Sequence, residues 1–126
     1  MQDTSQDEQN DMYSQLMMIS EEALVSAYYE TAYHALSAAM HYAQSCSDEQ
    51  RLCLVEQTAK KQQDWVDTHA PEHRMSTQST TKRHGVSLYD MLARQSSAQV
   101  LILHQKHRRD SAKSLPWPGD EKDELF

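Results

Sequence analysis

The sequence contains very little glycine, with two residues in 126, at Gly85 and Gly119. Glycine adopts positive φ at the least cost, so its scarcity disfavours a fold built from tight β-hairpins. Apolar residues are also few, at 38% of the chain against roughly 45–50% in typical globular domains. We therefore expect a modest hydrophobic core and no hairpin-rich sheet.

Long apolar runs and secretory signals are missing as well. No stretch approaches the roughly 20 apolar residues of a membrane-spanning helix, and the amino-terminal MQDTSQDEQND is acidic and polar, unlike a signal peptide. Cys46 and Cys53 would lie about 10 Å apart along one helix, beyond disulfide reach. These absences predict a cytoplasmic protein with reduced thiols, no disulfide and no membrane association.

Residue types that favour helices are abundant. Alanine, glutamine, methionine and leucine are common, which predicts an all-α fold. We expect a three-helix antiparallel bundle over residues 12–110, and a short extra amino-terminal helix is compatible with the pattern. The expected helices span about 20–45, 48–68 and 87–109, joined by a long polar loop at 69–86. Ser20 is the expected cap of the first helix, and a start near Asp11 with a helix that runs straight through is the alternative. Residues 1–11 are expected to be a disordered acidic segment, and residues 111–126 an extended acidic tail.

Helical periodicity predicts which faces of these helices are buried. The segment at 20–45 is apolar around most of its circumference, which is typical of a central bundle helix or of one buried in a homodimer. The second helix has one apolar stripe, formed by Leu52, Val55, Ala59, Gln62 and Val66. The third begins with a capping box at Ser87 and Asp90, and its stripe comprises Leu88, Met91, Leu92, Ala98, Leu101 and Ile102.

Charge is distributed unevenly along this chain, whose net charge is −7. Residues 1–72 hold three Lys/Arg and thirteen Asp/Glu, whereas residues 73–113 hold eight Lys/Arg and two acidic residues. The overall negative charge argues against non-specific nucleic-acid binding by the whole molecule. The basic third helix either pairs with its acidic neighbours or presents a local basic surface.

Seven histidines make metal binding the first chemistry to consider. Glu30, His34 and His41 fall on roughly one side of a helix, and they would be the ligands of a metal-dependent hydrolase, which is the alternative function. The sequence has no Glu-x-x-His pair, no His-Glu-x-x-His signature and no Cys-x-x-Cys pair. The leading expectation is therefore a protein without cofactor, metal or catalytic residues.

Basic residues in the polar loop suggest a second kind of site. Arginine grips phosphate oxygens bidentately and helix starts bind anions, so phosphate or RNA binding is a further alternative. The binding candidates of the loop are Arg74, Lys82, Arg83 and His84, to which RNA binding would add Arg108 and Arg109. In the tail, Trp117 lies between two prolines and would either dock as an extended peptide or fold back on the bundle.

The segment SAYYETAYHALSAAM, residues 26–40, resembles the tyrosine- and alanine-rich helices of HEPN-type ribonuclease domains, which are small helical bundles that dimerise. Active members of that family carry an arginine followed by a histidine with four to six residues between them, and no arginine here has a histidine at that distance. The resemblance therefore assigns no catalytic residue. The sequence as a whole predicts a small soluble helical interaction or regulatory protein that binds a protein partner.

Overall fold

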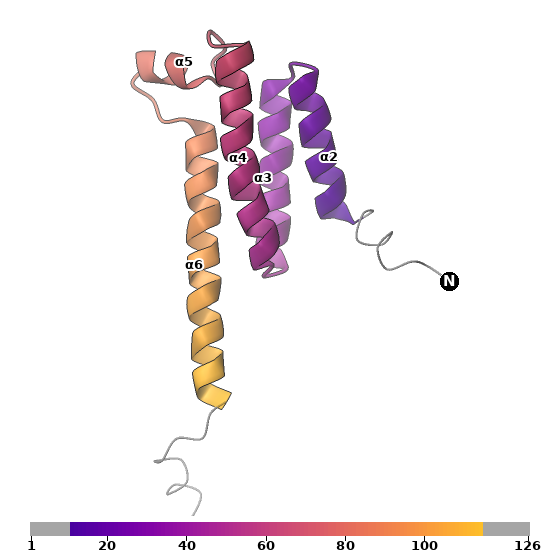
Figure 1. Cartoon of the computed structure of the whole chain (residues 1–126), viewed down its shortest axis with the longest axis vertical. Helices are drawn as coiled ribbons and strands as arrows, with labels where there is room; N and C mark the ends of the chain where they lie inside the picture. Colours follow the sequence, from indigo (N-terminus) through magenta and orange to yellow (C-terminus); the bar gives the residue numbers. More distant parts are fainter. Residues whose placement is uncertain (1–10, 115–126) are drawn as a thin grey trace, which may run out of the picture.

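The fold is entirely helical in the computed structural model, which describes residues 11–114 (Figure 1). No strand occurs within these residues, in agreement with the predicted all-α class. The predictions for residues 1–10 and 115–126, Trp117 among them, lie outside the described part of the chain. The helices are α2 (Met12–Val25), α3 (Tyr29–Ser45), α4 (Glu49–His69), α5 (Thr77–Lys82) and α6 (Leu88–Ser114).

The prediction of one continuous helix over residues 20–45 is wrong, because the chain turns back between α2 and α3. Ala27 has a φ of 67°. The Tyr28 N–H donates to the Ala23 carbonyl at 2.8 Å, and the Ala27 N–H donates to the Leu24 carbonyl at 3.1 Å. These two bonds define a Schellman motif, which usually has glycine at the position of positive φ. Within residues 11–114, the predicted three-helix bundle is thus replaced by four long helices and one short helix.

The start of α2 agrees with the alternative start near Asp11 and not with Ser20 as the cap. Asp11 is the residue that caps this helix, since its Oδ1 accepts a hydrogen bond from the Ser14 N–H at 2.9 Å. Ser20, the expected cap, lies in the middle of α2 and is completely buried. The apolar lead-in before Ser20 is therefore a full part of the bundle.

The four long helices lie side by side in the order α6, α4, α3, α2 (Figure 1). Neighbours in this row pack against each other, α3 also contacts α6, and the short α5 rests against α4. The helices α2 and α6 occupy the two outer positions. With 27 residues against 21 in α4, α6 extends beyond the end of its neighbour (Figure 1).

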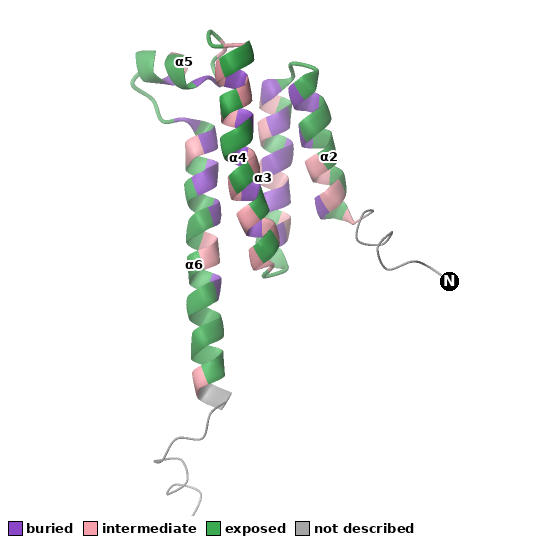
Figure 2. Cartoon of the chain, in the orientation of Figure 1, coloured by how far each residue is buried: buried purple, intermediate pink, exposed green. Residues whose placement is uncertain are grey.

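Helix α3 is central, as its apolar circumference predicted. Its alanines let the neighbouring helices approach closely, while its larger side chains fill the space between them. The buried residues of α3 are Tyr29, Ala32, Ala35, Leu36, Ala39, Met40 and Ala43. The stripe predicted for α4 is also confirmed, because Leu52, Val55, Ala59, Gln62 and Val66 are all buried. Figure 2 shows buried and exposed stretches alternating along this helix.

A chain of buried hydrogen bonds joins all four long helices. The Tyr89 hydroxyl donates to Gln62 Oε1 at 2.8 Å, and Gln62 Nε2 donates to Ser20 Oγ at 2.7 Å. The Ser20 hydroxyl in turn donates to the carbonyl of Ala32 at 2.7 Å. Burial, with a smaller contribution from nearby Tyr33, raises the pKa of Tyr89 far above its usual value. The network therefore requires the neutral phenol.

Candidate interaction surface on helix α6

The apolar stripe that the sequence predicts for the core side of α6 lies mostly on its solvent side. Met91, Leu101 and Ile102 are 51%, 57% and 54% exposed, respectively. Leu88 and Ala98 are exposed as well, so Leu92 is the one member of that stripe that is buried. The prediction for this helix is therefore wrong in its orientation.

Helix α6 has two apolar faces, and the one that meets α4 combines small residues with larger apolar ones. Ala93 and Ser96 are small, which lets α6 approach α4 closely, while Tyr89 and Leu92 fill the space on either side. The sequence signal favoured the other face because its side chains are larger and more apolar. We call that other face the outer face of α6, and it comprises Met91, Arg94, Ala98, Leu101 and Ile102.

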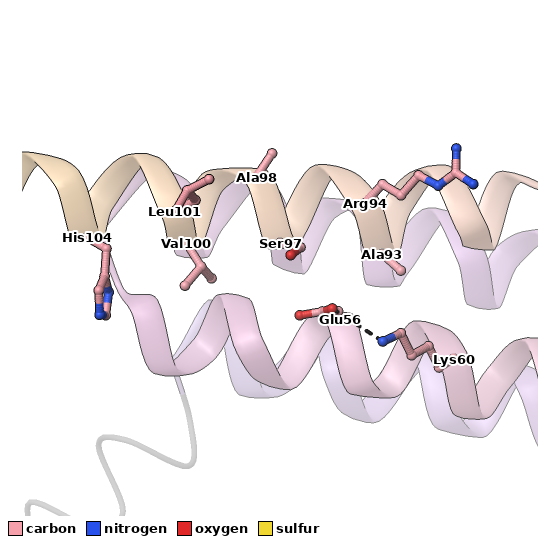
Figure 3. A pocket seen from close by; sticks show the side chains of 9 residues that line it. All are labelled: Glu56, Lys60, Ala93, Arg94, Ser97, Ala98, Val100, Leu101 and His104. Carbon is pink, nitrogen blue, oxygen red and sulfur yellow. Dashed lines mark hydrogen bonds and ion pairs between the residues drawn. The ribbon is translucent and has the colours of Figure 1, made fainter.

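A groove between α4 and α6 borders the outer face (Figure 3). It has a volume of about 640 Å³, and Figure 3 shows Ala93 and Val100 pointing towards α4, whereas Arg94 and Ala98 lie on the far side of α6. On the α4 side, Lys60 Nζ lies 3.4 Å from Glu56 Oε1. An apolar floor with charged rims is suited to receive an amphipathic segment.

Three arginines on α6 carry the positive charge of this surface. Arg94, Arg108 and Arg109 make no ion pair or hydrogen bond with another described side chain, in contrast to the arginines elsewhere. Arg51 pairs with Asp11 and Asp48. The interpretation that the basic third helix pairs with acidic neighbours therefore does not hold for these three side chains within residues 11–114.

The overhanging half of α6 is tied to α4 through two histidines. His104 Nδ1 lies 3.0 Å from Glu49 Oε2, and His107 Nδ1 lies 2.8 Å from Glu49 Oε1. The carboxylate sits between the two imidazoles, and no set of three His, Cys, Asp or Glu side chains within residues 11–114 is arranged to hold a metal ion. The contact joins the first residue of α4 to the carboxyl-terminal half of α6.

The predicted metal ligands lie on one side of α3, but on its solvent-exposed strip. His34 and His41 are exposed, and Glu30 is partly exposed. The Glu30 carboxylate is engaged by Arg74, whose Nε lies 2.8 Å from Glu30 Oε1. No second helix supplies a ligand to this strip among the described residues, so the sequence pattern does not become a site inside the bundle.

The predicted loop at 69–86 contains α5, and two of its four basic candidates come together. The Arg83 guanidinium donates from Nη2 to the Arg74 carbonyl at 2.8 Å and from Nε to the Ser79 carbonyl at 3.4 Å. Asp67 fixes the start of α5 by accepting from the Thr77 N–H at 2.7 Å. Lys82 and His84 are exposed, and His84 has a φ of 53°. Arg74 and Arg83 thus bind partners within the chain.

Comparison of the chain with protein-family models, with curated proteins and with solved structures found no match. Within residues 11–114, none of the helices combines the length and the apolar content needed to cross a bilayer. The outer face of α6 was not among the predicted site residues. The signal that could have found it is a second stripe at helical spacing, which was present in the sequence but was interpreted as the core.

Proposed function

We propose that this chain is a small helical interaction protein that acts without catalysis, by binding a protein partner through the outer face of α6. The observation that supports this function is the exposure of Met91, Leu101 and Ile102 on a helix whose opposite side already packs on α4. Contiguous exposed apolar surface is uncommon on monomeric proteins and marks interaction sites.

The chemistry of the outer face favours a particular kind of partner. Its apolar centre is bordered by unpaired arginines, so an amphipathic helix with acidic flanks would satisfy both features. Nucleic acid is a poorer fit, because phosphates would use Arg94, Arg108 and Arg109 but leave Leu101 and Ile102 in water. Binding that collapses steeply with added salt would instead indicate an RNA partner.

Site-specific photocrosslinking tests this proposal. A photoreactive amino acid replaces Ala98 on the outer face, and a second protein carries it at Gln57, which is exposed on α4. We expect a discrete protein adduct from position 98 in native cells and none from position 57. Equal labelling from both positions would contradict the proposal, since it would indicate non-specific contact.

A matched pair of leucines provides the control. Leu101→Glu should abolish the adduct at position 98, because a carboxylate replaces the centre of the apolar surface. Leu54 on α4 is 48% exposed, similar to the 57% of Leu101. Leu54→Glu therefore places the same charge on a comparably exposed site. An adduct that survives Leu101→Glu, or one lost equally in Leu54→Glu, would refute the outer face as the binding surface.

A further inference from the structure

We infer that the partner of the outer face of α6 is helix α2 of a second copy of this chain, packed antiparallel to it. This inference rests on the proposed function and names the partner of the same surface. The other outer helix of the row has the complementary chemistry, apolar and acidic where α6 is apolar and basic.

Helix α2 exposes an apolar face that nothing in its own chain fills. Met18 and Val25 are exposed there, and they line a shallow hollow of about 500 Å³ together with Glu21 and Glu22. Met12 and Ile19 extend the exposed apolar surface along the same helix. The helix contains no lysine or arginine, so all of its charged side chains are acidic.

The two outer faces match in spacing when the helices run in opposite directions. From Val25 to Glu22 to Met18 the steps are three and four residues, and from Met91 to Arg94 to Ala98 they are again three and four. Each set therefore forms one stripe on the side of its helix opposite the core. The antiparallel register places Val25 against Met91, Glu22 against Arg94, and the large Met18 against the small Ala98.

Contact between these helices has to be intermolecular. In one chain α2 and α6 are separated by α3 and α4 (Figure 1). Pairing α6 with another α6 would put the unpaired Arg94, Arg108 and Arg109 of both copies into one interface, and pairing α2 with α2 would put Glu21 and Glu22 of both copies into one interface. Like charges facing each other are unfavourable, so the mixed pair is the favoured one. Because the two faces lie on opposite sides of the row, this contact is heterologous, and it repeats head to tail in a ring or an open chain.

The central pair of this contact is available on both sides. Glu22 and Arg94 are exposed, and neither makes an ion pair with another described residue. A carboxylate and a guanidinium that meet inside an apolar contact fix its register as well as its strength. These two residues are therefore the ones to exchange in a test.

The test is a charge exchange, with self-association of the full-length chain measured by sedimentation equilibrium. The unmodified chain should self-associate. Glu22→Lys and Arg94→Glu should each weaken association by more than about tenfold, because like charges then meet in a desolvated contact. An equimolar mixture of the two variants should associate again, since each supplies the face that complements the other. Lys61→Glu, on the exposed strip of α4, is the control and should change nothing.

Several outcomes would overturn the inference. A chain that stays monomeric has no such contact, and a loss in both variants without recovery on mixing would exclude the Glu22–Arg94 pairing. Association that is insensitive to Glu22→Lys but altered by Arg94→Glu would point to α6 pairing with itself.

The crosslinking experiment separates this inference from the proposed function. If Leu101→Glu abolishes the adduct at position 98 while Glu22→Lys does not, the proposed function stands and its partner is another protein. If neither Leu101→Glu nor Glu22→Lys changes the adduct at position 98, both the proposed function and this inference are refuted.

Discussion

Helices α4 and α6 pack against each other, yet they differ in where their apolar stripes lie. In α4 one stripe is apolar, and all five of its members are buried. In α6 the core side buries Leu92 and Leu103 beside the small Ala93, while Leu101 and Ile102 face solvent. The predicted stripe of α4 thus contributes to the fold alone, whereas the apolar residues of α6 are divided between the fold and an exposed surface.

This difference shows that hydrophobicity along a helix does not by itself identify the core. A helix that serves two surfaces carries two stripes, and the more apolar stripe need not be the one packed within its own chain. In α6 the inner stripe packs through small residues together with Tyr89, Leu92 and Leu103. The outer stripe exposes large apolar side chains, which is the feature that supports the proposed binding surface.

The largest test of this comparison is a pair of leucine truncations. Leu52→Ala on α4 removes a completely buried side chain, and we expect it to lower the free energy of unfolding by about 2 to 5 kcal/mol. Leu101→Ala on α6 removes an exposed side chain and should change stability by less than about 0.5 kcal/mol. Urea denaturation at a concentration where the chain is monomeric measures both. Similar losses in the two variants would show that the outer stripe belongs to the core.

Much of α4 could be predicted from the sequence because its signals agree with one another. Asp48 caps the helix through the Arg51 N–H at 3.1 Å, so α4 begins at Glu49, one residue after the expected start, and all members of its one predicted stripe are buried. The stripe even included the polar Gln62, whose spacing placed it among the apolar residues. Sequence reasoning succeeds where capping, periodicity and burial all indicate the same face.

At the α2–α3 turn and on α6, the structure differs from the prediction for identifiable physical reasons. Positive φ occurs at Ala27, Ser47 and His84, none of which is glycine. These turns therefore lack the residue that usually marks such a position in a sequence. The α2–α3 break is hidden in this way, and the count of helices changes with it. The outer face of α6 was missed because an exposed stripe and a buried one have the same periodicity. Which of them is buried depends on tertiary packing.

The next test concerns the polar link between the two helices. Gln62→Ala leaves the Tyr89 hydroxyl and the Ser20 hydroxyl without the partner that joins them, and we expect a loss of about 1 to 3 kcal/mol. Gln57 lies on the exposed strip of the same helix, so Gln57→Ala should be neutral within about 0.5 kcal/mol. Denaturation of both variants under the same conditions compares them. Equal effects would mean that the buried network adds nothing to the attachment of α6.

The smallest effect is a dependence on pH that arises at Tyr89, the large side chain by which α6 is anchored to α4. Burial raises the pKa of this phenol in the folded state, whereas in the unfolded chain it stays near its usual value of about 10. Above pH 10 the unfolded chain loses this proton and the folded chain keeps it, so stability falls as pH rises. Below pH 10 the contribution is complete.

Comparison with Tyr89→Phe isolates this contribution from the other titrating groups. At pH 8 the phenylalanine variant should be less stable by about 1 kcal/mol, because Gln62 Oε1 loses its donor. As pH increases beyond 10, the unmodified chain should lose stability faster than the variant, and the gap between the two denaturation midpoints should narrow. A constant gap up to pH 11 would show that Tyr89 ionises equally in both states. The core side of α6 would then be open to water, and its difference from the outer face would be smaller than the structure indicates.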